Sequence, residues 1–82
     1  MSLELYQQAA LRQDLPQHGL RKGDVATLVD HVPHPDGKET GYILEIFNVL
    51  GESIAVVAVP ASTVEPLRAD KIFTVRHWAE AS

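Results

Sequence analysis

The chain has 82 residues, a net charge of −4, 45% hydrophobic residues and 22% charged residues, which predict a single ordinary globular domain. It contains no cysteine, so disulfides, thiolate catalysis and cysteine-based zinc sites are excluded. The N-terminal MSLELYQQ lacks the pattern of a secretory signal, and the longest apolar run, residues 54–59, is too short to span a membrane, so we expect a soluble cytoplasmic protein.

Residues 1–8 are expected to form a short N-terminal arm, and residues 9–13 indicate the first short strand. Pro16 has no backbone N–H and a fixed φ, so this strand has to end near it. The apolar residues of the chain are mostly Val, Ala, Leu and Ile in short runs, which favours strands for the rest of the chain as well.

The stretch DLPQHGLRKG, residues 14–23, predicts a compact loop that returns the chain to a second strand. Gly19 and Gly23 permit the positive φ of tight turns, and the leucine between them is expected to pack beneath the loop. Asp14 and Asp24 bracket the loop and are expected to accept hydrogen bonds from nearby backbone N–H groups. Turn geometry therefore explains this stretch without a catalytic role.

Residues 25–32 predict the second strand, and their irregular apolar pattern indicates a strong bend with a bulge. The HPDG segment that follows predicts a turn. Residues 42–47 alternate as a third strand. Glu45 marks one face of this strand as the solvent side, so the even-numbered residues are expected to face the core.

A hairpin at residues 48–51 leads to a fourth strand, residues 54–59, which is almost entirely apolar and is therefore expected at the centre of the sheet. Residues 60–63 suit a single 3₁₀ turn. Residues 64–67 predict a short final strand, whose proline is tolerated at a sheet edge.

These elements predict an all-β fold: a small SH3-like barrel of about five short, strongly bent strands over residues 1–67. Residues 68–82 form a C-terminal extension, expected to pack as a strand or helix on the barrel or on a partner. An OB-like barrel is the alternative, but that fold has longer strands and a helix between its third and fourth strands, where this sequence has no helix-length segment.

Five short motifs within residues 9–67 resemble, in combination, a small bacterial family that is known as a domain of unknown function. They are Asp14-Leu15-Pro16, His18-Gly19-Leu20, Lys22-Gly23-Asp24-Val25, Gly51-Glu52 and Val59-Pro60-Ala61. The resemblance implies a compact SH3-like barrel and no particular activity. The third motif also resembles the glycine-containing turn of KOW-type barrels, which bind nucleic acid or ribosomal partners.

The histidines offer little catalytic or metal chemistry. His31 and His34 have the H-x-x-H spacing of shared metal ligands on a helix, but Pro33 lies between them, so we expect exposed loop histidines. His18 lies beside a turn glycine and could act as a general base. No nucleophile motif accompanies it, so we expect His18 to fix the loop through a local hydrogen bond. We predict no catalytic, cofactor-binding or metal-binding residue.

The seven basic residues are dispersed, and only Arg21 and Lys22 are adjacent. Nucleic-acid binding needs clustered Lys and Arg to displace counterions. The dispersion and the acidic net charge therefore count against a nucleic-acid partner, although a fold can gather scattered charges. His18, Arg21 and Lys22 form a candidate loop surface.

The run KIFTVRHW, residues 71–78, is too apolar for an idle tail. Phe73, Val75, Arg76 and Trp78 are the candidate partner-binding residues, because Trp and Arg are favoured at interface hot spots. The alternatives are that the run covers the chain's own barrel or is exchanged between the two copies of a homodimer.

These features predict a non-catalytic interaction or adaptor module that binds a protein partner or self-associates. No membrane partner and no cofactor are expected. The alternatives are a KOW-like nucleic-acid-binding barrel and an accessory domain or subunit of an enzyme. An independent catalyst is not expected, because 82 residues leave little room for a deep pocket.

Overall fold

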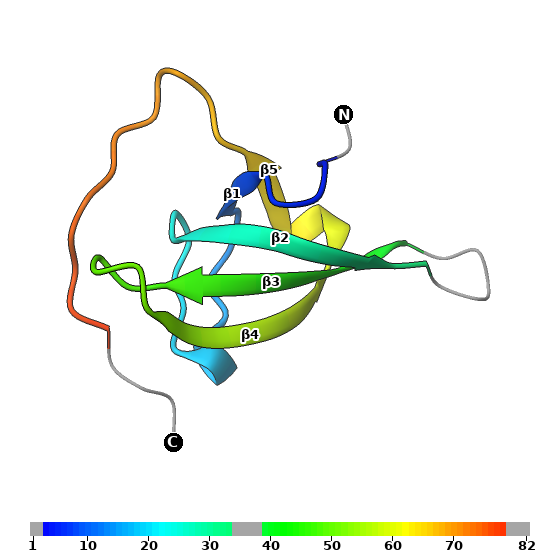
Figure 1. Cartoon of the computed structure of the whole chain (residues 1–82), viewed down its shortest axis with the longest axis horizontal. Coiled ribbons are helices and arrows are strands. Elements are labelled where there is room, and N and C mark those ends of the chain that lie inside the picture. The colour runs from blue at the N-terminus through cyan, green and yellow to red at the C-terminus, as the bar shows by residue number, and fades with distance from the viewer. Residues whose placement is uncertain (1–2, 34–38, 79–82) are drawn as a thin grey trace.

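The computed structural model describes residues 3–33 and 39–78 (Figure 1). Its strands are β1 (Gln8–Leu11), β2 (Val25–Val32), β3 (Gly41–Phe47), β4 (Ser53–Pro60) and β5 (Val64–Pro66), and its 3₁₀ turns are η1 (Pro16–His18) and η2 (Ala61–Thr63). The strands form one antiparallel sheet in the order β4-β3-β2-β1-β5. The prediction of an all-β fold with five short strands is confirmed. The sheet is not closed into a barrel, because its end strands β4 and β5 are not paired in the described residues.

The fourth strand lies at an edge of the sheet, so the prediction that it is central is wrong. The central place belongs to β2, and along β4 only Val57 and Val59 are buried. Val56 is 61% exposed. Small and β-branched residues favour a strand whether one or both faces are covered. The apolar run therefore indicates a strand without indicating its place in the sheet.

The core is filled mainly by alternate residues of the strands. Leu28 of β2 pairs with Leu44 of β3, and both are fully buried. Tyr42 and Ile46 are buried on the same face of β3, as the position of Glu45 predicted. The predicted irregularity of β2 is also confirmed, since the register with β3 shifts between Leu28 and Asp30.

The loop between β1 and β2 is a compact turn with several hydrogen bonds between its own residues. Gly19 and Gly23 have φ values of 69° and 93°, and Leu20 is 2% exposed beneath the loop. The Asp14 carboxylate accepts a hydrogen bond from the backbone N–H of Lys22 at 2.9 Å. The interpretation of this stretch as turn geometry is confirmed.

In the described part of the C-terminal extension, residues 68–78, the structure has neither the strand nor the helix that the sequence predicts. After a turn in which the Lys71 N–H donates to the Arg68 carbonyl at 3.0 Å, the extension arcs away from the sheet and returns to it near the β1–β2 loop (Figure 1). No described strand lies beside it to complete a ladder, so its backbone stays irregular. We call residues 68–78 the strap.

The predicted turn at Asp36-Gly37 and the histidine at position 34 lie outside the described residues. No helix in either described range has the length and apolar character needed to cross a membrane.

Candidate functional site

A cavity of about 940 Å³ lies between the strap and the sheet. On the sheet side it is lined by β1, by the start of β2 with the loop before it, and by the β3–β4 hairpin. Phe47, Ile54 and Leu67 contribute apolar surface there. The strap forms the opposite wall, from Arg68 to Trp78. The cavity therefore exists because the strap returns to the sheet instead of pairing along it.

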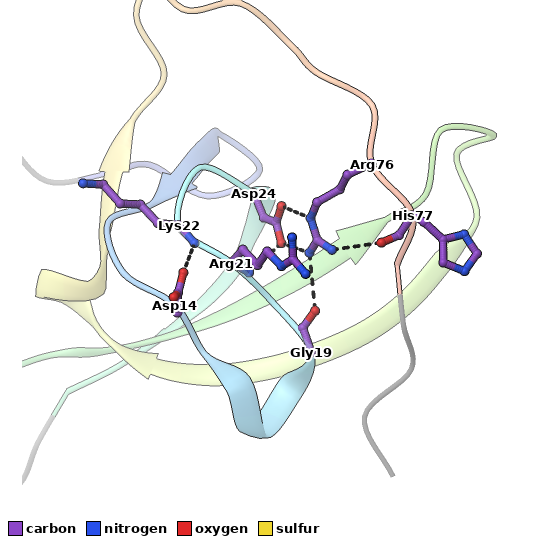
Figure 2. A network of polar contacts seen from close by, with 7 residues as sticks. All are labelled: Asp14, Gly19, Arg21, Lys22, Asp24, Arg76 and His77. Carbon is purple, nitrogen blue, oxygen red and sulfur yellow. Dashed lines mark hydrogen bonds and ion pairs between the residues drawn. The ribbon is translucent and has the colours of Figure 1, made fainter.

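One polar cluster holds the end of the strap against the β1–β2 loop (Figure 2). The Arg76 Nε donates to Oδ1 of Asp24 at 2.9 Å, and Nη2 of the same guanidinium donates to Oδ2. Nη2 also donates to the backbone carbonyl of Gly19 at 3.3 Å. The two charged side chains are 27% and 20% exposed. A bidentate arginine–carboxylate pair fixes both distance and orientation, so this pair, which we call the clamp, positions the strap.

Asp24 can serve the clamp because the loop already fixes its carboxylate. Its Oδ2 accepts the backbone N–H of Arg21 at 2.8 Å, and its backbone N–H donates to the Arg21 carbonyl at 3.0 Å. Burial by itself would raise the pKa of Asp24, but the hydrogen bonds from Arg76 and from the Arg21 N–H, together with both guanidinium charges, lower it below its ordinary value of 3.8. The hydrogen bond to Asp24 raises the pKa of Arg76. Both members of the clamp are therefore charged at neutral pH.

Trp78 is the second attachment of the strap. Its side chain is half-buried and packs against the hydrophobic core. The indole Nε1 is buried, and no acceptor for its proton lies among the described residues. A buried donor without an acceptor costs free energy.

Between these attachments and β5, the strap leaves its large apolar side chains uncovered. Ile72 is 88% exposed, Phe73 is 71% exposed and Val75 is 84% exposed, although all three also contribute to the cavity wall. Single exposed apolar residues are ordinary, but a group of them beside a cavity is typical of an interaction surface.

The fold also gathers basic side chains that are dispersed in the sequence. Five of the seven lysines and arginines line this cavity: Arg21, Lys22, Arg68, Lys71 and Arg76. The carboxylates that line it among the described residues are Asp24 and Glu65, and Asp24 is paired with the clamp arginine. The cavity is therefore locally basic on a chain whose net charge is −4.

The residues predicted from sequence come together at this cavity with one exception. Phe73, Val75, Arg76 and Trp78 lie in its strap wall, and Arg21 and Lys22 lie in its loop wall. His18 is half-buried in η1 and does not line the cavity, and its backbone N–H donates to the Leu15 carbonyl at 2.9 Å. Their role in partner binding stays a prediction.

Sequence reasoning missed the hairpin side of the cavity, Phe47 and Ile54, and the basic pair Arg68 and Lys71. No local pattern marked Phe47, Ile54 or Arg68, and Lys71 begins the apolar run at residues 71–78 without being one of its candidate binding residues. Only the return of the strap makes these residues neighbours. The described residues contain no group of three or more His, Cys, Asp or Glu side chains that could hold a metal ion. Exposed His31 has its ring 6.0 Å from that of Tyr42.

Comparison with known protein families matches residues 5–66 to a domain of unknown function (DUF4926). The match confirms the predicted resemblance to such a domain and covers every strand of the sheet. The strap and the rest of the C-terminal extension lie beyond it. No curated protein and no solved structure matches the chain.

Proposed function

The chain belongs to the DUF4926 family of domains of unknown function, and from this premise we propose that it is a non-catalytic interaction module that binds a protein partner at the cavity beneath the strap. The alternatives stay predictions: a KOW-like nucleic-acid-binding barrel and an accessory domain or subunit of an enzyme.

The observation that carries the proposal is the state of the strap. Its end is held by a bidentate ion pair, while Ile72, Phe73 and Val75, which precede this pair in the strap, are 71–88% exposed. A segment that served only to cover the sheet would turn such side chains inward, since each buried large apolar side chain contributes about 1.5–3 kcal/mol. A segment that is fixed in place while its apolar side chains stay exposed presents a surface for another molecule.

A non-catalytic role is supported by the chemistry of Asp24, the most constrained carboxylate of the cavity. A general base works best with a pKa near the operating pH. The pKa of Asp24 is shifted the other way, and both carboxylate oxygens already accept hydrogen bonds from Arg76 or Arg21. The group is arranged to hold the strap rather than to exchange a proton. We place the interaction in the cytoplasm, since a chain without cysteine does not depend on an oxidising compartment.

The test is site-specific photocrosslinking in the cells that make the chain. Phe73 is replaced by p-benzoylphenylalanine, and a matched variant carries the same photoreactive group at Val56, which is 61% exposed on β4 and does not line the cavity. We expect a discrete adduct from position 73 and none from position 56. The protein in the adduct is then purified and mixed with the purified full chain, where binding has to be reproduced.

An adduct with a second copy of the chain would establish the self-associating form of the same function. No adduct at position 73, an equal adduct at both positions, or an adduct whose protein does not bind the purified chain would overturn the proposal.

A further inference from the structure

We infer that the cavity beneath the strap takes a segment of a partner protein in which carboxylate side chains stand beside large apolar side chains. This inference rests on the proposed function and adds the chemistry of the partner.

The charge of the cavity supplies the first argument. Of its basic side chains, Arg76 is occupied by Asp24, whereas Arg21, Lys22, Arg68 and Lys71 are exposed. Glu65 is the other carboxylate that lines the cavity in the described part of the chain. The exposed cations therefore outnumber the carboxylates, and electrostatic complementarity favours an acidic partner.

The charge of the remaining surface sharpens this preference. The chain carries eleven acidic residues, and among the described basic residues only Arg12 does not line the cavity. An acidic molecule is repelled by most of the surface and attracted at the cavity, which directs it there during diffusional encounter.

The apolar part of the wall supplies the second argument. Phe47 and Ile54 on the hairpin side line the same cavity as Phe73 and Val75 on the strap side. Large apolar side chains of a partner would lose contact with water between these two walls, which is the main favourable term in association. Carboxylates on the same segment would reach Arg68 and Lys71 at the upstream end of the strap.

A peptide fits these features better than a nucleic acid. A nucleic acid carries a phosphate at every nucleotide, so a strand extending beyond the cavity would meet the acidic remainder of the surface. A protein segment can limit its charges to the few residues that the cavity covers.

The test begins with selection from a phage-displayed library of random peptides on the full chain. The peptides that are enriched are synthesised with a fluorescent label, and their Kd values are measured by anisotropy. Two charge-reversed forms of the chain are compared: Arg68→Glu with Lys71→Glu, and, as the matched control, Arg12→Glu. Arg12 is exposed like the other two residues but does not line the cavity.

We expect the enriched peptides to combine Asp or Glu with Phe, Leu or Trp. Their Kd should rise at least about tenfold on the doubly reversed chain and stay within about twofold on the Arg12→Glu chain, because only the first change places like charges against the peptide. Replacing the Glu residues of the peptide by Gln should weaken binding to the unchanged chain. Circular dichroism confirms that each variant is folded before binding is measured.

Enriched peptides that are neutral or basic, or whose Kd is unchanged on the chain with Arg68→Glu and Lys71→Glu, would overturn the inference. If such peptides still lose binding on Phe73→Ser, the proposed interaction function stands and only the acidic chemistry falls. A labelled deoxythymidine oligonucleotide is measured at the same salt concentration, and tighter binding of it than of every selected peptide would also overturn the inference. If no peptide is enriched and position 73 gives no adduct, both the proposed interaction function and the present inference are overturned.

Discussion

Breaking the clamp between Arg76 and Asp24 should release the strap before the sheet unfolds. The change is Arg76→Gln, which keeps a polar side chain of similar reach and removes the charge and the bidentate geometry. The clamp joins Arg76 of the strap to Asp24, which lies 52 residues earlier in the chain. Its loss therefore leaves Trp78 as the remaining core attachment among the described residues of the strap.

The magnitude follows from the exposure of the pair. Fully exposed ion pairs contribute about 0.2–1 kcal/mol, whereas hydrogen bonds to charged groups contribute about 1.5–3 kcal/mol. The two side chains are 27% and 20% exposed and share two hydrogen bonds. We therefore expect a coupling free energy of about 1–2 kcal/mol, between the two limits.

A double-mutant cycle measures this coupling. Asp24→Asn is the second single change, because its amide oxygen can still accept the Arg21 N–H. Unfolding in urea is followed by circular dichroism for the sheet and by fluorescence of Trp78, the only tryptophan of the chain. In Arg76→Gln we expect the emission of Trp78 to shift to the red at urea concentrations that leave the sheet intact.

Arg68→Gln is the matched control, since Arg68 is an exposed arginine of the same strap. It should change stability by less than about 0.5 kcal/mol. A coupling free energy below about 0.3 kcal/mol, which is within the usual additivity of independent sites, would refute the reasoning, as would a Trp78 transition that coincides with that of the sheet in every variant.

Three further outcomes are expected from the same structure. Leu44→Ala should lower the free energy of unfolding by about 2–5 kcal/mol, because Leu44 is fully buried at the β2–β3 pairing. Val56→Ala, at an exposed position of β4, should lower it far less, and equal urea midpoints for the two variants would contradict this. Gly23→Ala should lower the free energy of unfolding by about 1–2 kcal/mol because Gly23 has a φ of 93°, although no atom lies within 4 Å of the added Cβ. An unchanged melting temperature would show that the turn adapts to the alanine. The pKa of Asp24 is lowered in the folded state, so the contribution of its carboxylate to the stability of the fold is complete above the ordinary pKa of 3.8 and is lost as the pH falls through the folded value. Acid titration of Trp78 fluorescence should show this loss in the unchanged chain and not in Asp24→Asn.

Much of the sheet could be predicted because its determinants are local. Prolines, turn glycines and the alternation of Tyr42, Leu44 and Ile46 act within a few residues, so the strands, the loop and the buried face of β3 were found from sequence. The edge position of β4 was not predicted from sequence, because the order of strands in a sheet depends on which strands pair with one another. An apolar run such as residues 54–59 satisfies an edge strand with one covered face as well as a central strand.

The candidate site was likewise predicted only in part from the sequence. The exceptional composition of the strap was visible in the sequence, so Phe73, Val75, Arg76 and Trp78 were predicted as partner-binding residues. Their irregular backbone was not predicted, since alternation in a short segment favours a strand only where a neighbouring strand can accept its hydrogen bonds.

By itself the sequence determined the all-β class, the number of strands, the geometry of the loop before β2 and the apolar character of the C-terminal extension, because each depends on backbone preferences and short-range patterns. Only the tertiary structure decided that the extension returns to Asp24, and with it that Arg68 and Lys71 meet Arg21 and Lys22 at one cavity. The physical reason is that charge and apolar contact act through space, so side chains dispersed along an acidic chain become a basic site only once the fold has brought them together.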